Sequence, residues 1–176
     1  SGDLLAQMSL PVQEDDTTGS LMARLAEIGA PFFAEALAGW VEGRIVPAPQ
    51  DHSQSTWFDR MHKEMGLIDW TLPAEEIHRR CRAFSPWPGT YTFFEGRRLL
   101  IHKVRPLAGS GSDQGKPAAL SDGEPGAVAA LDEGIVVRTG DGAVRLERLQ
   151  LAGRRVLDAE EFARGQRGFI GSRLGR

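Results

Sequence analysis

The residues whose types and spacing suggest chemistry in this sequence are cations. Arg60 and Lys63 stand three positions apart, and Lys103 and Arg105 stand two apart, as residues on one face of a strand do. Arg82 lies between these pairs, near the end of an expected helix. Each of these cations can neutralise one phosphate without reading a base. We therefore predict that these five positions contact the backbone of a nucleic acid.

Three of these cations also have a structural interpretation. Arg60 and Lys63 equally fit the solvated end of a linker. Arg82 has only His78 four residues before it, so no carboxylate is positioned to pair with it on a helix. For Arg82 we favour a structural role over phosphate binding, in which its side chain supports the aromatic ring of Trp87.

No pattern in the sequence indicates a catalytic, metal or cofactor site. Asp3, beside Gly2, fits a cap or a turn better than a catalytic carboxylate. The four histidines lack close metal-ligand spacing, and His78 with Cys81 supplies only two ligands. The sequence also contains no phosphate-binding glycine loop. Cys81 falls on the apolar side of a predicted helix, where a thiol belongs to the core.

Composition describes a water-soluble globular protein. The 176 residues are 41% hydrophobic and 26% charged, with a net charge of −3 that argues against a generic nucleic-acid binder. Residues 57–106 are the exception, because they carry nine Lys/Arg against six acids. No apolar run is long enough to cross a membrane, and the N-terminus has no signal-peptide pattern. A single cysteine suits a reducing compartment, so we expect a cytoplasmic protein without a membrane partner.

The segment up to Gly43 and the residues after it predict different structures. Residues 4–12 are predicted to form a strand, and apolar residues then recur at helical spacing to residue 41, with Pro31 marking a kink or a break between two helices. Gly43 ends that pattern. Residues 44–62 are rich in proline and polar residues and are predicted to be a linker. Thr71 is predicted to cap a helix that ends at Phe84, before the rigid Pro86-Trp87-Pro88 elbow.

After the elbow the pattern is one of short strands. Glu95-Gly96 and Gly140-Asp141-Gly142 have the composition of tight turns between strands. Residues 108–124 are predicted to be a mobile loop, and Asp158 is predicted to open a capping box for a last helix that ends at Gly165. A helix followed by five or six short strands predicts an α+β chain whose residues 63–176 form a small OB-like barrel.

Several motifs in their order resemble one family. Residues 68–70 (I-D-W), 73–77 (P-A-x-x-I) and 82–89 (R-A-x-x-P-W-P-G) resemble the start of the C-terminal domain of methionyl-tRNA formyltransferases, although Ser85 stands where the family usually has Asn. Residues 1–5 resemble the family's D-[ST]-G-D-x-L segment, entered partway through. Residues 60–64 resemble a segment that faces bound tRNA in the family. The resemblance extends over nearly the whole chain.

The resemblance implies formyl transfer from 10-formyltetrahydrofolate to methionyl initiator tRNA in translation initiation. It places the family's catalytic carboxylate just before Ser1, so no catalytic or cofactor-binding residue is expected here and the chain alone should be inactive. Residues 1–43 would be the end of the α/β formyltransferase domain, and residues 63–176 the tRNA-binding domain of an enzyme that is monomeric when intact.

Two other classes remain open from the sequence. A sugar-nucleotide formyltransferase, or the hydrolase domain of a formyltetrahydrofolate dehydrogenase, shares a similar R-A-x-x-P-[WY]-P-G segment. A small barrel that serves protein interaction is the second alternative. The helix before the linker argues against that alternative, because its Phe32, Phe33 and Trp40 would have no sheet beneath them.

Overall fold

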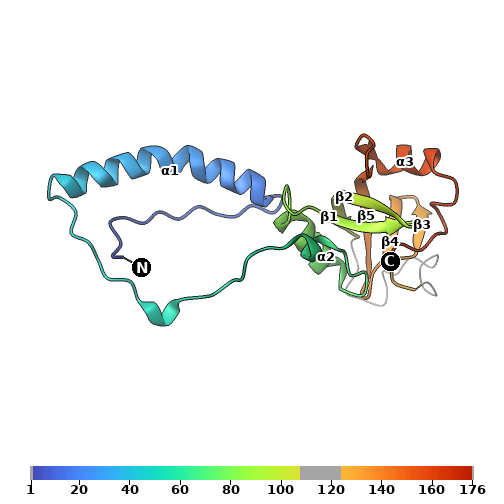
Figure 1. The fold of residues 1–176 in the computed structure, drawn as a ribbon, viewed down its shortest axis with the longest axis horizontal. Coiled ribbons are helices and arrows are strands. Elements are labelled where there is room, and N and C mark those ends of the chain that lie inside the picture. Colours follow the sequence, from blue (N-terminus) through green and yellow to red (C-terminus); the bar gives the residue numbers. More distant parts are fainter. Residues whose placement is uncertain (1, 108–123, 176) are drawn as a thin grey trace. The chain divides into compact units, whose positions relative to one another are not determined.

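The computed structural model describes residues 2–107 and 124–175. The chain divides into two compact units, Ser1–Arg60 and Met61–Arg176, whose ribbons are drawn in Figure 1. The predicted loop at residues 108–124 lies outside the described residues except for Glu124. The assignment of residues 1–43 to the end of a formyltransferase domain, with residues 44–62 as linker, stays a prediction.

The first unit is built on one helix, α1 (Thr18–Val41). Thr17 caps it, because its hydroxyl accepts a hydrogen bond from the amide of Ser20 and the Ser20 side chain accepts one in return from the Thr17 amide. Pro31 lies inside the helix, so the two-helix alternative is wrong. The helix continues because proline removes only one N–H donor from a run of otherwise good helix formers. As predicted, the helix ends just before Gly43, which has a positive φ of 75°.

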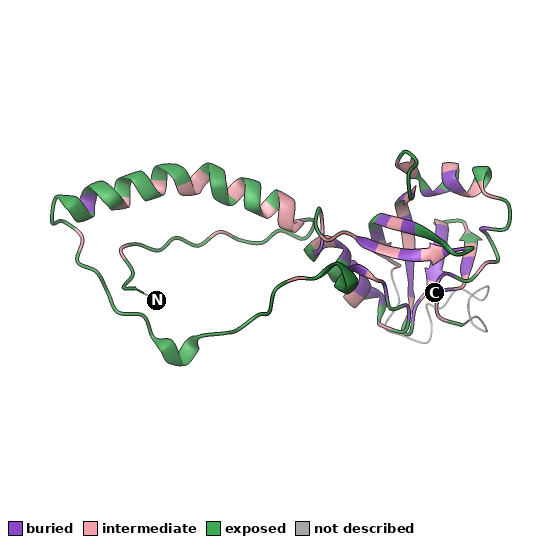
Figure 2. Ribbon diagram, in the orientation of Figure 1, coloured by how far each residue is buried: buried purple, intermediate pink, exposed green. Residues whose placement is uncertain are grey.

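The predicted strand at residues 4–12 is wrong. Only Leu4 makes a bridge there, to Ala48, through two hydrogen bonds of 2.8 and 2.9 Å. A strand needs a partner along its length, and the described part of the first unit offers a partner at this one position. The apolar side chains of α1 are left largely exposed, among them Met22, Phe33 and Trp40. Figure 2 shows this as a helix coloured mostly green and pink.

The second unit is an antiparallel sheet with short helices. The sheet order is β1-β2-β5-β4-β3, with β6 paired to β5. The strands are β1 (Thr90–Phe94), β2 (Arg97–Pro106), β3 (Val128–Leu131), β4 (Gly134–Arg138), β5 (Ala143–Leu151) and β6 (Leu157–Asp158). The helices of this unit are η2 (Lys63–Gly66), α2 (Ala74–Ala83) and α3 (Ala159–Gly165). A further short helix, η1 (His52–Gln54), belongs to the first unit. This is a small α+β domain, and its named strands do not close into a barrel.

The C-terminal segment joins the two edges of this open sheet. Gly175 bridges to Phe93 on β1, and Arg173 bridges to Ala127 just before β3. The amide of Leu174 also donates to the Gly126 carbonyl at 2.8 Å. The last residues of the chain therefore satisfy backbone groups that both edge strands would otherwise expose to solvent.

The predicted turns are confirmed, but the side-chain caps predicted at Thr71 and Asp158 are not. Glu95 and Gly96 both have positive φ in the β1–β2 turn, as a type I′ hairpin requires. Thr71 does not cap α2, because its amide and hydroxyl donate to the Asp69 carboxylate at 2.9 and 2.6 Å. Pro73 occupies the cap position instead. Asp158 is at the cap position of α3, but its side chain accepts no capping hydrogen bond.

The predicted elbow after α2 is confirmed, but its aromatic ring, Trp87, is not buried in the core. Phe84 is the C-cap of α2, and the peptide bonds before Pro86 and Pro88 are both cis. The ring of Trp87 between them is 50% exposed. Trp70 is the buried tryptophan, and its indole N–H donates to the Thr92 hydroxyl at 3.1 Å. The core is thus filled by Trp70 and not by the elbow ring.

The main core lies on one face of the sheet, and Val136 with Ala143 forms a second, smaller buried cluster. Ala74, Ile77 and Cys81 of α2 belong to the same buried cluster as Leu99 and Ile101 of β2. Three phenylalanines, Phe94, Phe162 and Phe169, fill the space beneath α3 in edge-to-face pairs whose ring centroids are 4.9 to 6.5 Å apart. Figure 2 shows the purple of buried residues concentrated on the strands.

We predict that Phe169→Ala lowers the free energy of unfolding by about 3–5 kcal/mol. Phe169 is 0% exposed and contacts two other rings, so its removal leaves a cavity. Chemical denaturation measured by circular dichroism gives this value. Ile170→Ala, at the next residue and 50% exposed, is the control and should change stability by less than ~1 kcal/mol. Equal effects of the two substitutions would contradict this core.

Candidate nucleic-acid interface

Three cations on neighbouring strands converge on one carboxylate. The Nζ atom of Lys103 lies 3.0 Å from Glu147, the Nε atom of Arg105 lies 3.2 Å from it, and a terminal nitrogen of Arg145 lies 2.6 Å from it. Lys103 and Arg105 belong to β2, and Arg145 and Glu147 belong to β5. We call these four residues the Glu147 cluster. Among the described residues, one carboxylate contacts all three of these cations.

The pairing of β2 with β5 places the cluster on the face away from the core. Arg105 lies opposite Arg145, and Val104 lies opposite Leu146. Val104 and Leu146 are buried, so the alternation of a strand puts the two arginines on the outer face. Like charges directly opposite each other repel, and Glu147 between them offsets this repulsion.

A register shift on each side of Lys103 breaks the strict alternation of β2. Ile101 and Val104 are both buried although they are three residues apart, and the same holds for their partners Leu149 and Leu146 on β5, because each strand has one unpaired residue in this stretch. Lys103 lies between the two shifts, opposite Arg148, and its side chain is 52% exposed. The simple alternation expected for this strand is therefore wrong at one step, yet Lys103 and Arg105 still reach the same carboxylate.

The pKa of Glu147 reflects these contacts. Burial of its carboxyl by itself raises the pKa, but the hydrogen bonds from Arg145 and Lys103 and their charges outweigh burial. The net result is a pKa below its ordinary value of 4.5. The Glu147 side chain is only 18% exposed, so the ion pairs are partly shielded from solvent.

Aromatic rings continue the outer face toward β1. Tyr91 and Phe93 alternate with buried residues of β1, so they lie on the outer side, and their ring centroids are 5.9 Å apart at nearly right angles. The guanidinium of Arg98 lies 3.7 Å from the centre of the Tyr91 ring. His102 and Gln150 are joined across β2 and β5 at 2.9 Å. The outer face therefore combines cations, ring edges and amides, which are groups that contact phosphates and bases.

The other predicted site residues lie elsewhere. Arg60 is the last residue of the first unit, and Lys63 is the first residue of η2 in the second, both exposed. Residues 60–62 are not helical. Arg82 is half-buried on α2, a helix that packs on the core face of the sheet. The structure thus places Arg82 on a different side of the sheet from Lys103 and Arg105.

Arg145 and Glu147 are site residues that the sequence analysis missed. The segment 143–151 alternates buried residues with Arg145 and Glu147, and this alternation was the available signal. Sequence alone does not say which strand lies beside β2. On α2, Glu76 pairs with both Arg79 and Arg80, at 2.7 and 2.9 Å.

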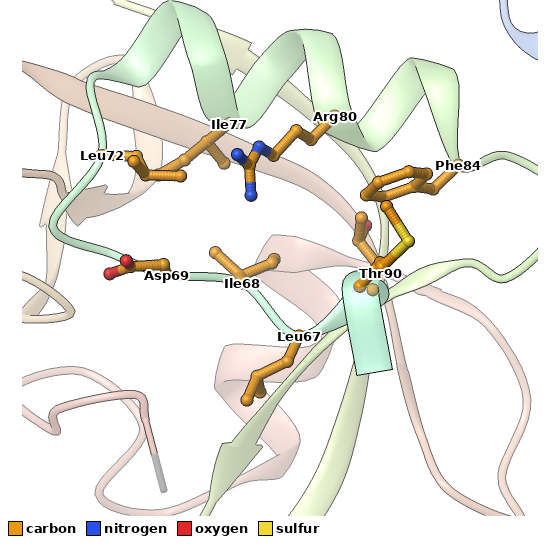
Figure 3. A pocket seen from close by; sticks show the side chains of 10 residues that line it. Leu67, Ile68, Asp69, Leu72, Ile77, Arg80, Phe84 and Thr90 are labelled. Atoms are coloured by element: carbon orange, nitrogen blue, oxygen red, sulfur yellow. The ribbon is translucent and has the colours of Figure 1, made fainter. Parts of the chain in front are cut away.

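A small cavity lies between α2 and the segment before it. Its lining includes Ile68, Leu72, Ile77 and Phe84, and the Arg80 guanidinium lies among them (Figure 3). The cavity volume is about 10 Å³, which is room for about one water molecule. It is a packing gap and not a ligand site.

The described residues 2–107 and 124–175 hold no group of three or more His, Cys, Asp or Glu side chains arranged for a metal ion. None of the helices in these ranges combines the length and apolar character that crossing a bilayer requires.

The described residues of the second unit form a small α+β domain built on an antiparallel sheet, and the outer face of this sheet carries basic residues. A family model described as "Formyl transferase, C-terminal domain" matches residues 60–167. This match covers more than half of the chain, and the chain belongs to that family.

Relatives and solved structures agree with this assignment. The chain is 41% identical over 175 residues to a methionyl-tRNA formyltransferase of Roseiflexus castenholzii, and 38% identical over 176 residues to one of Treponema pallidum. Each match covers 99% of this chain and 53% of the relative, so the chain spans about half the length of these curated relatives. HypX from Aquifex aeolicus is similar in structure, with a TM-score of 0.61 at 25% identity, over 92% of this chain and 28% of HypX.

We predict that Glu147→Gln lowers stability at neutral pH and has little effect in acid. A carboxylate whose pKa is depressed in the folded state contributes stability above its unfolded pKa, near 4.5, and this contribution is lost as the pH falls through the folded value. The difference in Tm between wild type and variant should therefore be largest at pH 7 and vanish below the depressed pKa.

Thermal melts from pH 2.5 to 7 measure this difference. Asp132→Asn, which removes an exposed carboxylate outside the cluster, should give a small difference at every pH. A Tm difference for Glu147→Gln that is independent of pH would contradict the ion pairs of the cluster.

Proposed function

We propose that this chain is the tRNA-holding part of a methionyl-tRNA formyltransferase, an enzyme of translation initiation. The observation that carries the proposal is the Glu147 cluster, in which three cations surround one carboxylate on an outer sheet face. The names of the relatives, all methionyl-tRNA formyltransferases, support tRNA over a sugar nucleotide as the substrate.

The catalytic step belongs, in this proposal, to the part of the relatives that this chain does not cover. The formyl donor would be 10-formyltetrahydrofolate. One HypX structure is described as a complex with tetrahydrofolic acid, and this chain covers 29% of that protein. The groups on the outer face of the sheet are cations, amides and aromatic rings, which are suited to binding and orienting a polynucleotide. The intact enzyme would act as a monomer in the cytoplasm.

The proposed mode of binding is contact with the sugar-phosphate backbone. Arg105 and Arg145 are planar forks that match phosphate oxygens, and Lys103 adds a mobile point charge beside them. Glu147 holds the three cations together in the free protein, so they need little reordering when phosphates arrive. An OB-like arrangement, with the C-terminal segment between β1 and β3, would present this face as OB folds present theirs.

We predict that Lys103→Glu combined with Arg105→Glu weakens tRNA binding and flattens its salt dependence. Two lost phosphate contacts should reduce the slope of log K against log salt by about 1.4–1.8. The measurement is affinity for initiator tRNA from low to moderate salt. The control is Arg164→Glu with Arg167→Glu, the same charge change on exposed residues outside the cluster. An unchanged slope in the folded double variant would remove the cluster from the interface.

Arg60 and Lys63 are proposed as a second set of phosphate contacts. Arg60→Glu with Lys63→Glu should weaken binding of initiator and elongator tRNAs to about the same extent, because phosphates carry no sequence information. Competition binding with the two tRNAs measures this effect. A loss confined to one tRNA would mean base recognition, and no loss would favour the alternative that this segment is a solvated linker.

A further inference from the structure

An open groove in the second unit lies where β2 begins, β5 ends and α3 closes over the sheet. Its volume is about 590 Å³, within the range of small-molecule sites. The floor is apolar, formed by Leu151, Leu157 and Phe162. Three arginines, Arg97, Arg154 and Arg155, line the groove, and no carboxylate does.

The three arginines come from two separate segments and are held differently. Arg97, at the start of β2, is held by the Gln166 side-chain oxygen at 3.2 Å and lies 3.4 Å from Glu95. Arg155 pairs with Glu161 at 2.5 Å. Both carboxylates lie outside the lining of the groove. Each of these two guanidiniums is therefore oriented by a partner and has further N–H donors available.

Arg154, the third arginine of the lining, lies in the turn after β5 and precedes Arg155 in the chain. Its backbone is fixed at both ends, because its amide donates to Leu151 at 2.9 Å and its carbonyl accepts from Gln150 at 2.7 Å. Its exposed side chain makes no ion pair or hydrogen bond with the described residues. Arg154 therefore combines a fixed backbone with a guanidinium that has no partner among the described residues. Together with the oriented guanidiniums of Arg97 and Arg155, it suits the recognition of an anion with several oxygens.

We propose that this groove binds a phosphomonoester attached to a flat or apolar group, such as a nucleoside monophosphate. The three guanidiniums would take the phosphate, and the base would lie over Leu157 and Phe162. The groove is distinct from the Glu147 cluster, because Arg97 and Lys103 are six residues apart on β2, or roughly 20 Å along a strand. The site goes beyond the proposed tRNA interface and does not depend on it.

Two sources offer this chemistry, a free nucleotide and the phosphorylated end of an RNA. The probes are therefore AMP, adenosine, and a short RNA with or without a 5′ phosphate, each added to the whole chain. Backbone amide shifts of Gly153, Arg154 and Gln166 report binding in the groove. We expect AMP to move these amides and adenosine to bind at least about tenfold more weakly. A phosphorylated RNA that binds as tightly as AMP identifies an RNA end, and AMP binding alone identifies a free nucleotide.

Arg154→Glu should weaken AMP binding by about tenfold or more, whereas Arg164→Glu, an equal charge change outside the groove, should change it by less than about twofold. Arg154→Gln serves if the first variant does not fold. The proposal is overturned if AMP and phosphorylated RNA leave the groove amides unmoved, if adenosine binds as well as AMP, or if both Arg154 variants bind normally. Because the tRNA affinity of the Lys103 and Arg105 variant is measured separately, this failure is distinguishable from failure of the proposed function.

Discussion

The antiparallel pairing of β2 with β5 is the constraint on which the second unit depends. It brings Ile101 opposite Leu149 on the core face and Arg105 opposite Arg145 on the outer face. A slip of one residue would exchange these faces, burying arginines and exposing the aliphatic side chains that contact α2. The energetics of the core therefore fix the position of the cations. Burial of apolar side chains therefore fixes the strand register, and with it the positions of the polar side chains on the outer face, although the buried side chains do not contact phosphate.

Close backbone contacts hold α2 against this sheet. A Cβ atom on Gly140 would lie 1.7 Å from the Thr71 carbonyl oxygen, so only glycine permits this approach. The approach lets the amide of Ala74, the first residue of α2, donate to Asp141 in the turn between β4 and β5 at 3.0 Å. The helix thus begins without a side-chain cap, because a backbone carbonyl of the sheet satisfies one of its first donors.

Local chemistry explains what the sequence could predict. Glu95-Gly96 and Gly140-Asp141-Gly142 determine their turns within a few residues, and Pro86 with Pro88 ends α2 at Phe84, so these features were found. The caps at Thr71 and Asp158 were wrong because Asp69 takes the hydroxyl of Thr71 and Asp158 makes no cap contact. The strand order of the sheet, and the meeting of Lys103 with Glu147, depend on pairings between distant segments. Periodicity shows which residues share a face, but it does not show which strands are neighbours.

The cluster and the groove illustrate two ways of handling positive charge on one small sheet. In the cluster, Glu147 occupies the centre and contacts all three cations, so the cations are mutually ordered on one surface of the sheet. Such a surface suits a polyanion that offers many equivalent phosphates. In the groove, Glu95 and Glu161 pair with their arginines from outside the lining, so no carboxylate occupies the centre. An open centre above an apolar floor favours one compact anion, because only a ligand that fits the groove meets all three guanidiniums at once.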